Sequence, residues 1–286
     1  MLGIPVRYLL KHPLAAAELA VDPLQTWTTI QDVYAAEREQ RRPQCPYQAE
    51  GNWEERLHRR LGAPWPCESA SEFQLLWEGV VAELETKGIH AGPESFGSWN
   101  DGDAGLTRAA WCLVRHLRPE KVVETGVAHG VTSRIILEAL EKNGSGHLWS
   151  IDLPPMEKSW REQVGIAVGL QNAPRWTYIK GSSRLRLPRL LSRLGQIDLF
   201  IHDSLHSERN VRFELDCAWP SLTPGGALLV DDVDANWGFH SFTQSFAGYQ
   251  AMICEAEPLY PDPRRFNQKG LFGIILKDEA ESARAA

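Results

Sequence analysis

The sequence predicts an α/β protein with a doubly wound, mostly parallel, seven-stranded sheet, a C-terminal antiparallel hairpin and an N-terminal helical extension. From Gly105 onward, short apolar segments typical of strands alternate with helical segments. Two further strand-like segments close the chain without a helix between them. The first hundred residues differ, because they are rich in tryptophan and show helical spacing.

Five strands are expected over residues 121–125, 147–151, 176–180, 197–202 and 227–231. Helices are expected over residues 107–117, 133–142, 161–170, 187–194 and 208–222. Because the connections are short, the strands should run parallel, with right-handed crossovers that place helices on both faces. Residues 251–257 and 271–276 should add the antiparallel hairpin at the edge of the sheet.

The extension, residues 1–104, is predicted to be helical, with its helical spacing plainest from Phe73 to Leu84 and a stop at Gly88. We expect its tryptophans to be core residues rather than ligand-binding ones; they are Trp27, Trp53, Trp65, Trp77 and Trp99. The sheet domain should cover residues 105–278, and residues 279–286 form a polar tail. The extension could also support a homodimer.

Composition narrows the range of partners and compartments. The net charge is −7 and the pI is about 5.8, so no basic field recruits nucleic acid, and a small-molecule partner is expected. Five scattered cysteines without a CxxC pair indicate reduced thiols in a cytoplasmic protein. Charges and prolines interrupt the apolar N-terminus, so neither a membrane span nor an export signal is expected.

The first motif is the loop after the first strand, Glu124-Thr125-Gly126-Val127-Ala128-His129-Gly130. Its two glycines permit a sharp turn and the close approach of a ligand, and the following helix directs its N-terminal amides at that ligand. A dinucleotide loop would carry GxGxxG, but Ala128 and Ser133 replace the second and third glycines. Glu124 would repel a pyrophosphate and could bind a cationic amino-acid group. The alternative is a tight turn without a ligand.

The second motif is Asp152, at the end of the next strand, where a carboxylate can bind both hydroxyls of a ribose. The third is a set of acids, Asp203, Asp231 and Asp232, which follow two strands that open at the same sheet edge. Converging carboxylates favour a hard cation such as Mg²⁺ between them. The alternative for all of these acids is capping of turns and helices.

Histidines accompany these acids. His206 follows Asp203 closely and could act as a general base, although a solvated loop histidine is the alternative. His129 and His202 are interpreted as structural. Trp237, Phe239 and His240 follow Asp232 and are candidates for the wall of an acceptor pocket.

Together these motifs resemble the class I S-adenosylmethionine (SAM) dependent methyltransferases over residues 105–277, including the terminal strand pair of that Rossmann-like fold. The resemblance implies that Glu124, Gly126 and Gly130, with Ser133 beside them, bind the methionine part of SAM. It implies that Asp152 binds the ribose and that the loop with Ser182 and Ser183 lies near the adenine.

Within the class, the segments Ile201–His206, Leu222–Gly226 and Val230–Val233 are similar to the macrocin O-methyltransferase-like branch. That branch includes metal-dependent sugar O-methyltransferases, in which the matching acids bind Mg²⁺; here they are Asp203, Asp231 and Asp232. Cephalosporin hydroxylase-like proteins share similar motifs.

The resulting hypothesis is SAM-dependent O-methylation of a small-molecule hydroxyl, such as that of a sugar or natural product, assisted by Mg²⁺ or a similar divalent cation. Asp203 and His206 would be the catalytic residues, with His206 taking the acceptor's proton. One alternative is a SAM-binding protein of the cephalosporin hydroxylase-like type without methyl transfer. Another is a nicotinamide-dependent oxidoreductase, which the missing glycines and the terminal strand pair disfavour.

Overall fold

The computed structural model describes residues 23–39, 45–90, 102–153, 158–245, 250–259 and 270–277. Within these ranges, seven strands form one sheet in the order β3-β2-β1-β4-β5-β7-β6. The strands are β1 (Lys121–Thr125), β2 (His147–Asp152), β3 (Trp176–Lys180), β4 (Ile197–His202), β5 (Leu222–Val230), β6 (Met252–Glu255) and β7 (Leu271–Leu276). The predicted doubly wound architecture is confirmed.

Strands β1 to β5 are parallel, and their register brings the ends of the central strands together. Thr125 at the end of β1 pairs with Ile151 of β2 and with His202 of β4, and His202 pairs with Val230 of β5. The residues that follow these strands therefore emerge side by side at the carboxyl edge of the sheet.

The terminal strands form the expected antiparallel pair, with an order that sequence alone did not fix. Strand β7 lies between β5 and β6 and is antiparallel to both, so β6 is the edge strand. All six residues of β7 are buried, as expected for a strand with neighbours on both sides.

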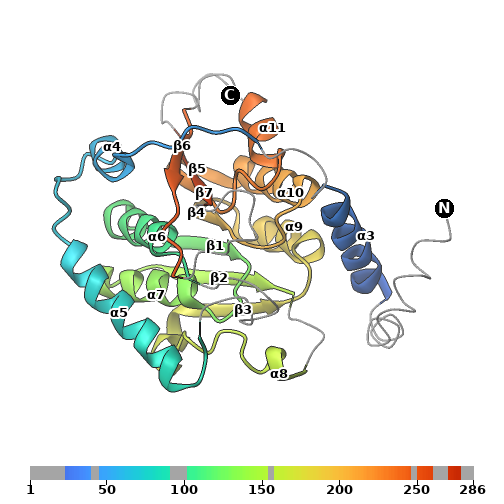
Figure 1. The fold of residues 1–286 in the computed structure, drawn as a ribbon, viewed down its shortest axis with the longest axis horizontal. Helices are drawn as coiled ribbons and strands as arrows, with labels where there is room; N and C mark the ends of the chain where they lie inside the picture. The colour runs from blue at the N-terminus through green and yellow to red at the C-terminus, as the bar shows by residue number, and fades with distance from the viewer. Residues whose placement is uncertain are drawn as a thin grey trace.

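Helices cover both faces of the sheet (Figure 1). One face packs against α6 (Ala104–Leu117) and α7 (Val131–Asn143), with α5 (Ala70–Thr86) outside them and α4 (Trp53–Arg60) beside strands β6 and β7. The other face packs against α9 (Ser183–Leu194), α10 (Glu208–Ala218) and α11 (Gly238–Gln244). Fully buried aliphatic and aromatic side chains fill both layers, so the sheet is rigid where its strands end.

Several helix boundaries differ from the expectations for local reasons. The helix expected over residues 161–170 is absent: α8 covers only Lys158–Arg161, turns follow, and a 3₁₀ helix, η2, spans Leu170–Arg175. Gly165 and Gly169 adopt positive φ values of 71° and 74°, which interrupt a helix. The helix expected to reach residue 222 ends at Ala218 and continues as the 3₁₀ helix η3, Trp219–Ser221, which contains a proline.

The described part of the extension is helical, in α3 (Pro23–Glu39), α4 and α5. Trp53 and Trp77 belong to the core, as expected, whereas Trp27 and Trp65 are 40% and 45% exposed. Trp99, the start of the chain and the expected tail over residues 279–286 lie outside the described residues. Among the described helices, none is both long and apolar enough to span a membrane.

Candidate active site

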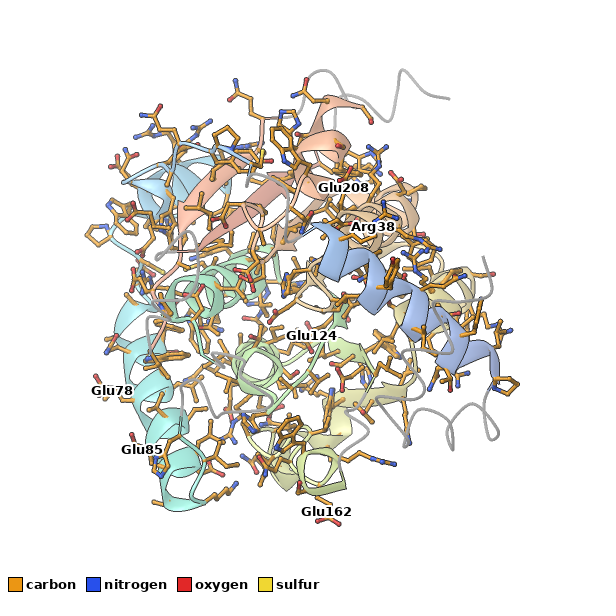
Figure 2. All side chains as sticks on the ribbon, turned by 45° about the vertical axis from the view of Figure 1, so that its right-hand side comes forward. Arg38, Glu78, Glu85, Glu124, Glu162 and Glu208 are labelled. Atoms are coloured by element: carbon orange, nitrogen blue, oxygen red, sulfur yellow. The ribbon has the colours of Figure 1, made fainter. Side chains whose placement is uncertain are left out.

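Glu124, the second-to-last residue of strand β1, has a fully buried carboxylate in the interior of the molecule (Figure 2). Its Oε2 accepts hydrogen bonds from the hydroxyls of Ser133 at 2.6 Å and Ser150 at 2.7 Å. Among the described residues, none donates a hydrogen bond to Oε1. Burial raises the pKa of this carboxyl to about 7. The protein thus fixes one oxygen and leaves the other for a donor on a bound molecule.

The glycine loop after β1 needs its glycines for contacts within the protein. Gly126 and Gly130 have φ values of 88° and 84°, which L side chains rarely adopt. A Cβ at position 126 would lie 1.7 Å from the carbonyl oxygen of Asp203, and one at position 130 would lie 2.9 Å from Cα of Gly165. The expectation that these glycines make room for a ligand is therefore incomplete, because the chain's own backbone already occupies that space.

Asp152 resembles Glu124 in having one fixed and one open oxygen. Its Oδ1 accepts a 3.3 Å hydrogen bond from the backbone N–H of Val127 in the glycine loop. Its Oδ2 is buried and has no hydrogen-bond partner in the described part of the chain. Burial raises the pKa of the Asp152 carboxyl to about 6. Two carboxylates with an open oxygen thus lie on adjacent strand ends beside one loop.

The two serines after β3 have different surroundings. Ser182 is the N-cap residue of α9, and its backbone N–H donates a 3.3 Å hydrogen bond to Oε1 of Gln25 on α3. Ser183 instead hydrogen bonds through its side chain to the buried Glu214. Only Ser182 therefore stays at the sheet edge where an adenine was expected, while Ser183 belongs to an interior network.

Asp203, His206 and Asp231 come together at the carboxyl edge. Nε2 of His206 lies 3.8 Å from Oδ1 of Asp203 and 3.9 Å from Oδ2 of Asp231. One potential ligand atom from each residue lies within 4.8 Å of the other two. Asp232 is not in this group: it is 8% exposed, has a φ of 48°, and has Asp103 as an electrostatic neighbour. Two of the three expected acids thus converge, with an imidazole beside them.

This donor set fits a divalent cation, because two carboxylates in one small group repel each other unless a positive charge lies between them. Oxygen ligands suit Mg²⁺ and Mn²⁺, and an imidazole nearby also suits later transition ions. Backbone hydrogen bonds fix both acids: the N–H of Asp203 donates to Thr125 at 2.9 Å, and that of Asp231 donates to His202 at 2.9 Å. The acids are therefore held by the sheet itself.

Behind this cluster lies a buried polar network centred on Glu214 of α10. Its Oε2 receives hydrogen bonds from His202 Nδ1 at 2.6 Å and from the Thr125 hydroxyl at 2.5 Å. Its Oε1 receives hydrogen bonds from the Ser204 hydroxyl at 2.8 Å and the Asn210 amide at 3.0 Å. Burial opposes ionisation of Glu214, but His202 and these donors outweigh it and lower the pKa to about 2.

The network reaches the candidate base through His202, whose ring lies edge-on to that of His206 with centroids 5.5 Å apart. His202 and Glu214 are both completely buried. Sequence reasoning interpreted His202 as structural and did not identify Glu214 at all. The only available signal was a glutamate on the apolar face of a helix, which is a weak one.

Helix α3, part of the helical extension expected from the sequence, packs beside this edge of the sheet through contacts that the sequence did not indicate. Asp32, which is 4% exposed, accepts a bifurcated hydrogen bond from the Nε–H of Arg184, with its two oxygens 2.9 and 2.8 Å from Nε. Glu39 accepts a hydrogen bond from the backbone N–H of Glu208 at the start of α10. Figure 2 shows the Arg38 end of α3 beside Glu208. The extension thus contacts the segments that follow β3 and β4.

Of the three residues expected to line the acceptor pocket, two are partly exposed and one is buried in the core. Phe239 is fully buried against Gly273 and belongs to the core, so it does not face an open pocket. Trp237 and His240 are partly exposed, and their rings meet edge-on with centroids 5.2 Å apart. Tyr47 lies beside His240 at 6.3 Å between centroids. An aromatic group near the loop after β5 therefore includes a residue from the extension.

The glycine loop yields a direct test of the backbone contact. Gly126→Ala should destabilise the fold by about 3 kcal/mol or more, because the new Cβ overlaps the Asp203 carbonyl. Gly144→Ala is the matched control: its φ is 76°, but a Cβ there meets nothing within 4 Å, so it should cost only about 1 kcal/mol. Urea unfolding measures both, and equal losses would refute the contact.

Glu214 should make the protein sensitive to acid. Its pKa is about 2 in the folded state against a reference of 4.5, so its stabilisation is complete above pH 4.5 and is lost as the pH falls towards 2. Glu214→Gln should cost about 3 kcal/mol at neutral pH, because it leaves His202 in a buried site without its carboxylate. Unfolding free energies of both proteins should converge as the pH falls below 4.5. A difference that grows in acid would contradict this role.

Part of the chain matches a known protein family, and solved structures share its fold. Residues 123–233, less than half of the chain, match a family model described as a methyltransferase domain. No curated protein sequence matches the chain. A candidate O-methyltransferase from Klebsiella pneumoniae has a similar structure, with a TM-score of 0.52 and 15% identity over 79% of this chain and 96% of that one.

Two further solved structures share the fold. The O-methyltransferase TomG of Streptomyces achromogenes, in complex with SAM, has a TM-score of 0.50 and 14% identity over 71% of this chain and 89% of that one. The O-methyltransferase of Bacillus cereus, in complex with SAH, has a TM-score of 0.50 and 12% identity over 78% and 97%. Residues 123–233 are therefore similar to a methyltransferase domain, and the chain has the Rossmann-like fold of these solved O-methyltransferases.

Proposed function

We propose that this protein transfers the methyl group of SAM to a hydroxyl oxygen of a small molecule, with a divalent cation assisting. The observation that carries the proposal is the pair of buried carboxylates, Glu124 and Asp152, each with one oxygen open beside the glycine loop. Such oxygens can accept hydrogen bonds from an ammonium group and from the two hydroxyls of a ribose, and SAM carries both groups.

The cofactor would lie along the loop from Gly126 to Gly130. Glu124 would accept a hydrogen bond from the ammonium of the methionine part, and Asp152 would accept from the ribose hydroxyls. Ser133 supports this arrangement by holding the other oxygen of Glu124. Ser182, beside Gln25 of α3, would lie near the adenine, so the extension would help to cover the base.

Asp203 and Asp231 would hold the cation, which supplies positive charge that lowers the pKa of the acceptor hydroxyl. His206 lies within 4 Å of both carboxylates and is the candidate general base. His206 would take the proton of the acceptor hydroxyl. Bound SAM would supply the methyl group to the acceptor oxygen and would leave as S-adenosylhomocysteine, which keeps the electron pair of the broken carbon–sulfur bond.

Substrate class follows from the surroundings of this cluster. Trp237, His240 and Tyr47 offer aromatic surface near the loop after β5, which suits the ring of a sugar or phenol. The similarity of the motifs to the macrocin O-methyltransferase-like branch favours a sugar or natural-product hydroxyl. Five free thiols are consistent with a cytoplasmic location of the protein.

The affinity for SAM should depend on pH in a defined direction. Burial raises the pKa of Glu124 to about 7 and that of Asp152 to about 6 in the protein without ligand. Both carboxyls therefore gain a proton as the pH falls from 8 to 5.5, and the charge that attracts the ammonium is lost. Titration calorimetry should show SAM binding that weakens below pH 7 and weakens further below pH 6.

A variant that removes the charge of Glu124 alone distinguishes its contribution to the pH dependence from that of Asp152. Glu124→Gln should weaken SAM binding at pH 8 by about 2 kcal/mol and remove the step near pH 7, while the step near pH 6 remains. Glu141→Gln is the control, because Glu141 lies on the surface at the far end of α7 and should change neither value. Binding that is unchanged between pH 8 and 5.5 would count against the proposed role of Glu124.

Cation binding can be measured without knowledge of the acceptor. Asp203→Asn and Asp231→Asn should each weaken Mn²⁺ binding, followed by electron paramagnetic resonance, at least about tenfold. Asp232→Asn should weaken it less, because its side chain lies outside the group. Methyl transfer to a panel of sugars and phenols should then fall after EDTA treatment and recover with Mg²⁺. Full activity in EDTA would remove the cation from the mechanism.

A further inference from the structure

A second group of metal-ligating side chains lies between the extension and α6, and none of its members belongs to the candidate active site. His58 comes from α4, Cys67 from the loop before α5, and Cys112 and His116 from α6. Cys112 and His116 are four residues apart, so they share one face of their helix. His58, Cys67 and Cys112 are all buried, and one ligand atom of each lies within 4.8 Å of the other two.

His58 is oriented as a ligand. Its Nδ1 lies 2.7 Å from the carbonyl oxygen of Glu54, which can only accept, so Nδ1 carries the proton. Nε2 therefore presents its lone pair, and the thiols of Cys67 and Cys112 are its neighbours. The residue is completely buried. A ring held through one nitrogen by a backbone carbonyl, with the other nitrogen open, is the usual arrangement of a metal-bound histidine.

Cys67 lies at the centre of the group. Its Sγ is 3.5 Å from Nε2 of His116 and 3.3 Å from the Ser69 hydroxyl. The Sγ atom of Cys112 lies within 4.8 Å of the Cys67 Sγ atom. Ligand atoms around a tetrahedral zinc ion are about 3.3–3.8 Å apart. Those of His58, Cys67 and Cys112 lie within 4.8 Å of one another, and His116 is close to Cys67 but outside this group, so the side chains would draw together on binding the ion.

We propose that His58, Cys67, Cys112 and His116 bind one structural Zn²⁺ ion. Two thiolates and two imidazoles are a ligand set that zinc prefers, whereas Mg²⁺ and Ca²⁺ prefer oxygen. Binding releases the thiol protons and requires no oxidant or reductant. Because the ligands are largely buried, the site is closed to substrate, as structural zinc sites are.

The ion would join three segments that are separate in the sequence. It would tie α4 and the loop that follows it to α6, the helix that leads directly into β1. The extension would thereby be fixed to the sheet domain by metal bonds in addition to its apolar packing, in which Trp53 and Leu57 take part. Loss of the ion should loosen the extension more than the sheet.

The test uses the full chain, stripped of metal with a chelator under reducing conditions and titrated with Co²⁺. We expect one equivalent of Co²⁺ to produce intense thiolate-to-cobalt charge-transfer absorption. Added Zn²⁺ should then displace the Co²⁺ and remove this absorption. Cys112→Ser should lower this absorption and weaken Co²⁺ binding, because it leaves Cys67 as the single thiolate of the site, and His116→Gln should weaken Co²⁺ binding at least about tenfold. Cys217→Ser, at a partly exposed cysteine on α10, is the matched control and should change nothing.

Asp231→Asn, a variant of the candidate active site, distinguishes the two sites. It should show the same Co²⁺ absorption as the wild-type protein, because a carboxylate ligand gives no thiolate-to-cobalt band. If Cys112→Ser fails to fold, the wild-type titration and His116→Gln still decide the matter. A folded, reduced wild-type protein that shows no thiolate absorption with Co²⁺ would overturn the proposal. Protein purified without chelator or reductant that holds no zinc and has a disulfide between Cys67 and Cys112 would also overturn it.

Discussion

The candidate site depends on the close approach of two loops at the carboxyl edge of the sheet. The backbone at Gly126 passes so near Asp203 that a Cβ would lie 1.7 Å from its carbonyl oxygen. This contact places the glycine loop after β1 directly beside the acids after β4 and β5. The in-line transfer proposed above would need donor and acceptor oriented within one small space, and parallel strands in register bring the two loops together there.

Around this contact, the buried acids differ in the hydrogen bonds that they receive. Glu124 and Asp152 each keep one oxygen open, and burial raises their pKa values. Glu214 has both oxygens bonded and a histidine beside it, so its pKa falls instead. The first two are therefore suited to receive a ligand, whereas the third is suited to fix β1, β4 and α10 behind the candidate base.

Much of this arrangement could be predicted from the sequence, because strand periodicity and the residues after each strand are local signals. The seven strands, the edge on which Glu124, Asp152 and Asp203 lie, and the terminal strand pair follow from such signals. The Glu214 network and the packing of α3 on Arg184 could not be predicted, since they join residues far apart in the chain. Asp232 shows the same limit: its spacing matches a cation ligand, but its backbone turns it out of the group.

The most direct test of the central claim, that one edge holds both the cofactor and the cation, is a crystal structure with S-adenosylhomocysteine and Mn²⁺. Anomalous scattering would locate the manganese independently of the ligand. The account predicts manganese between Asp203 and Asp231, the ammonium on Glu124, the ribose on Asp152, and the sulfur facing the metal cluster. Cofactor bound away from the Gly126 loop, or manganese bound only outside this cluster, would contradict it.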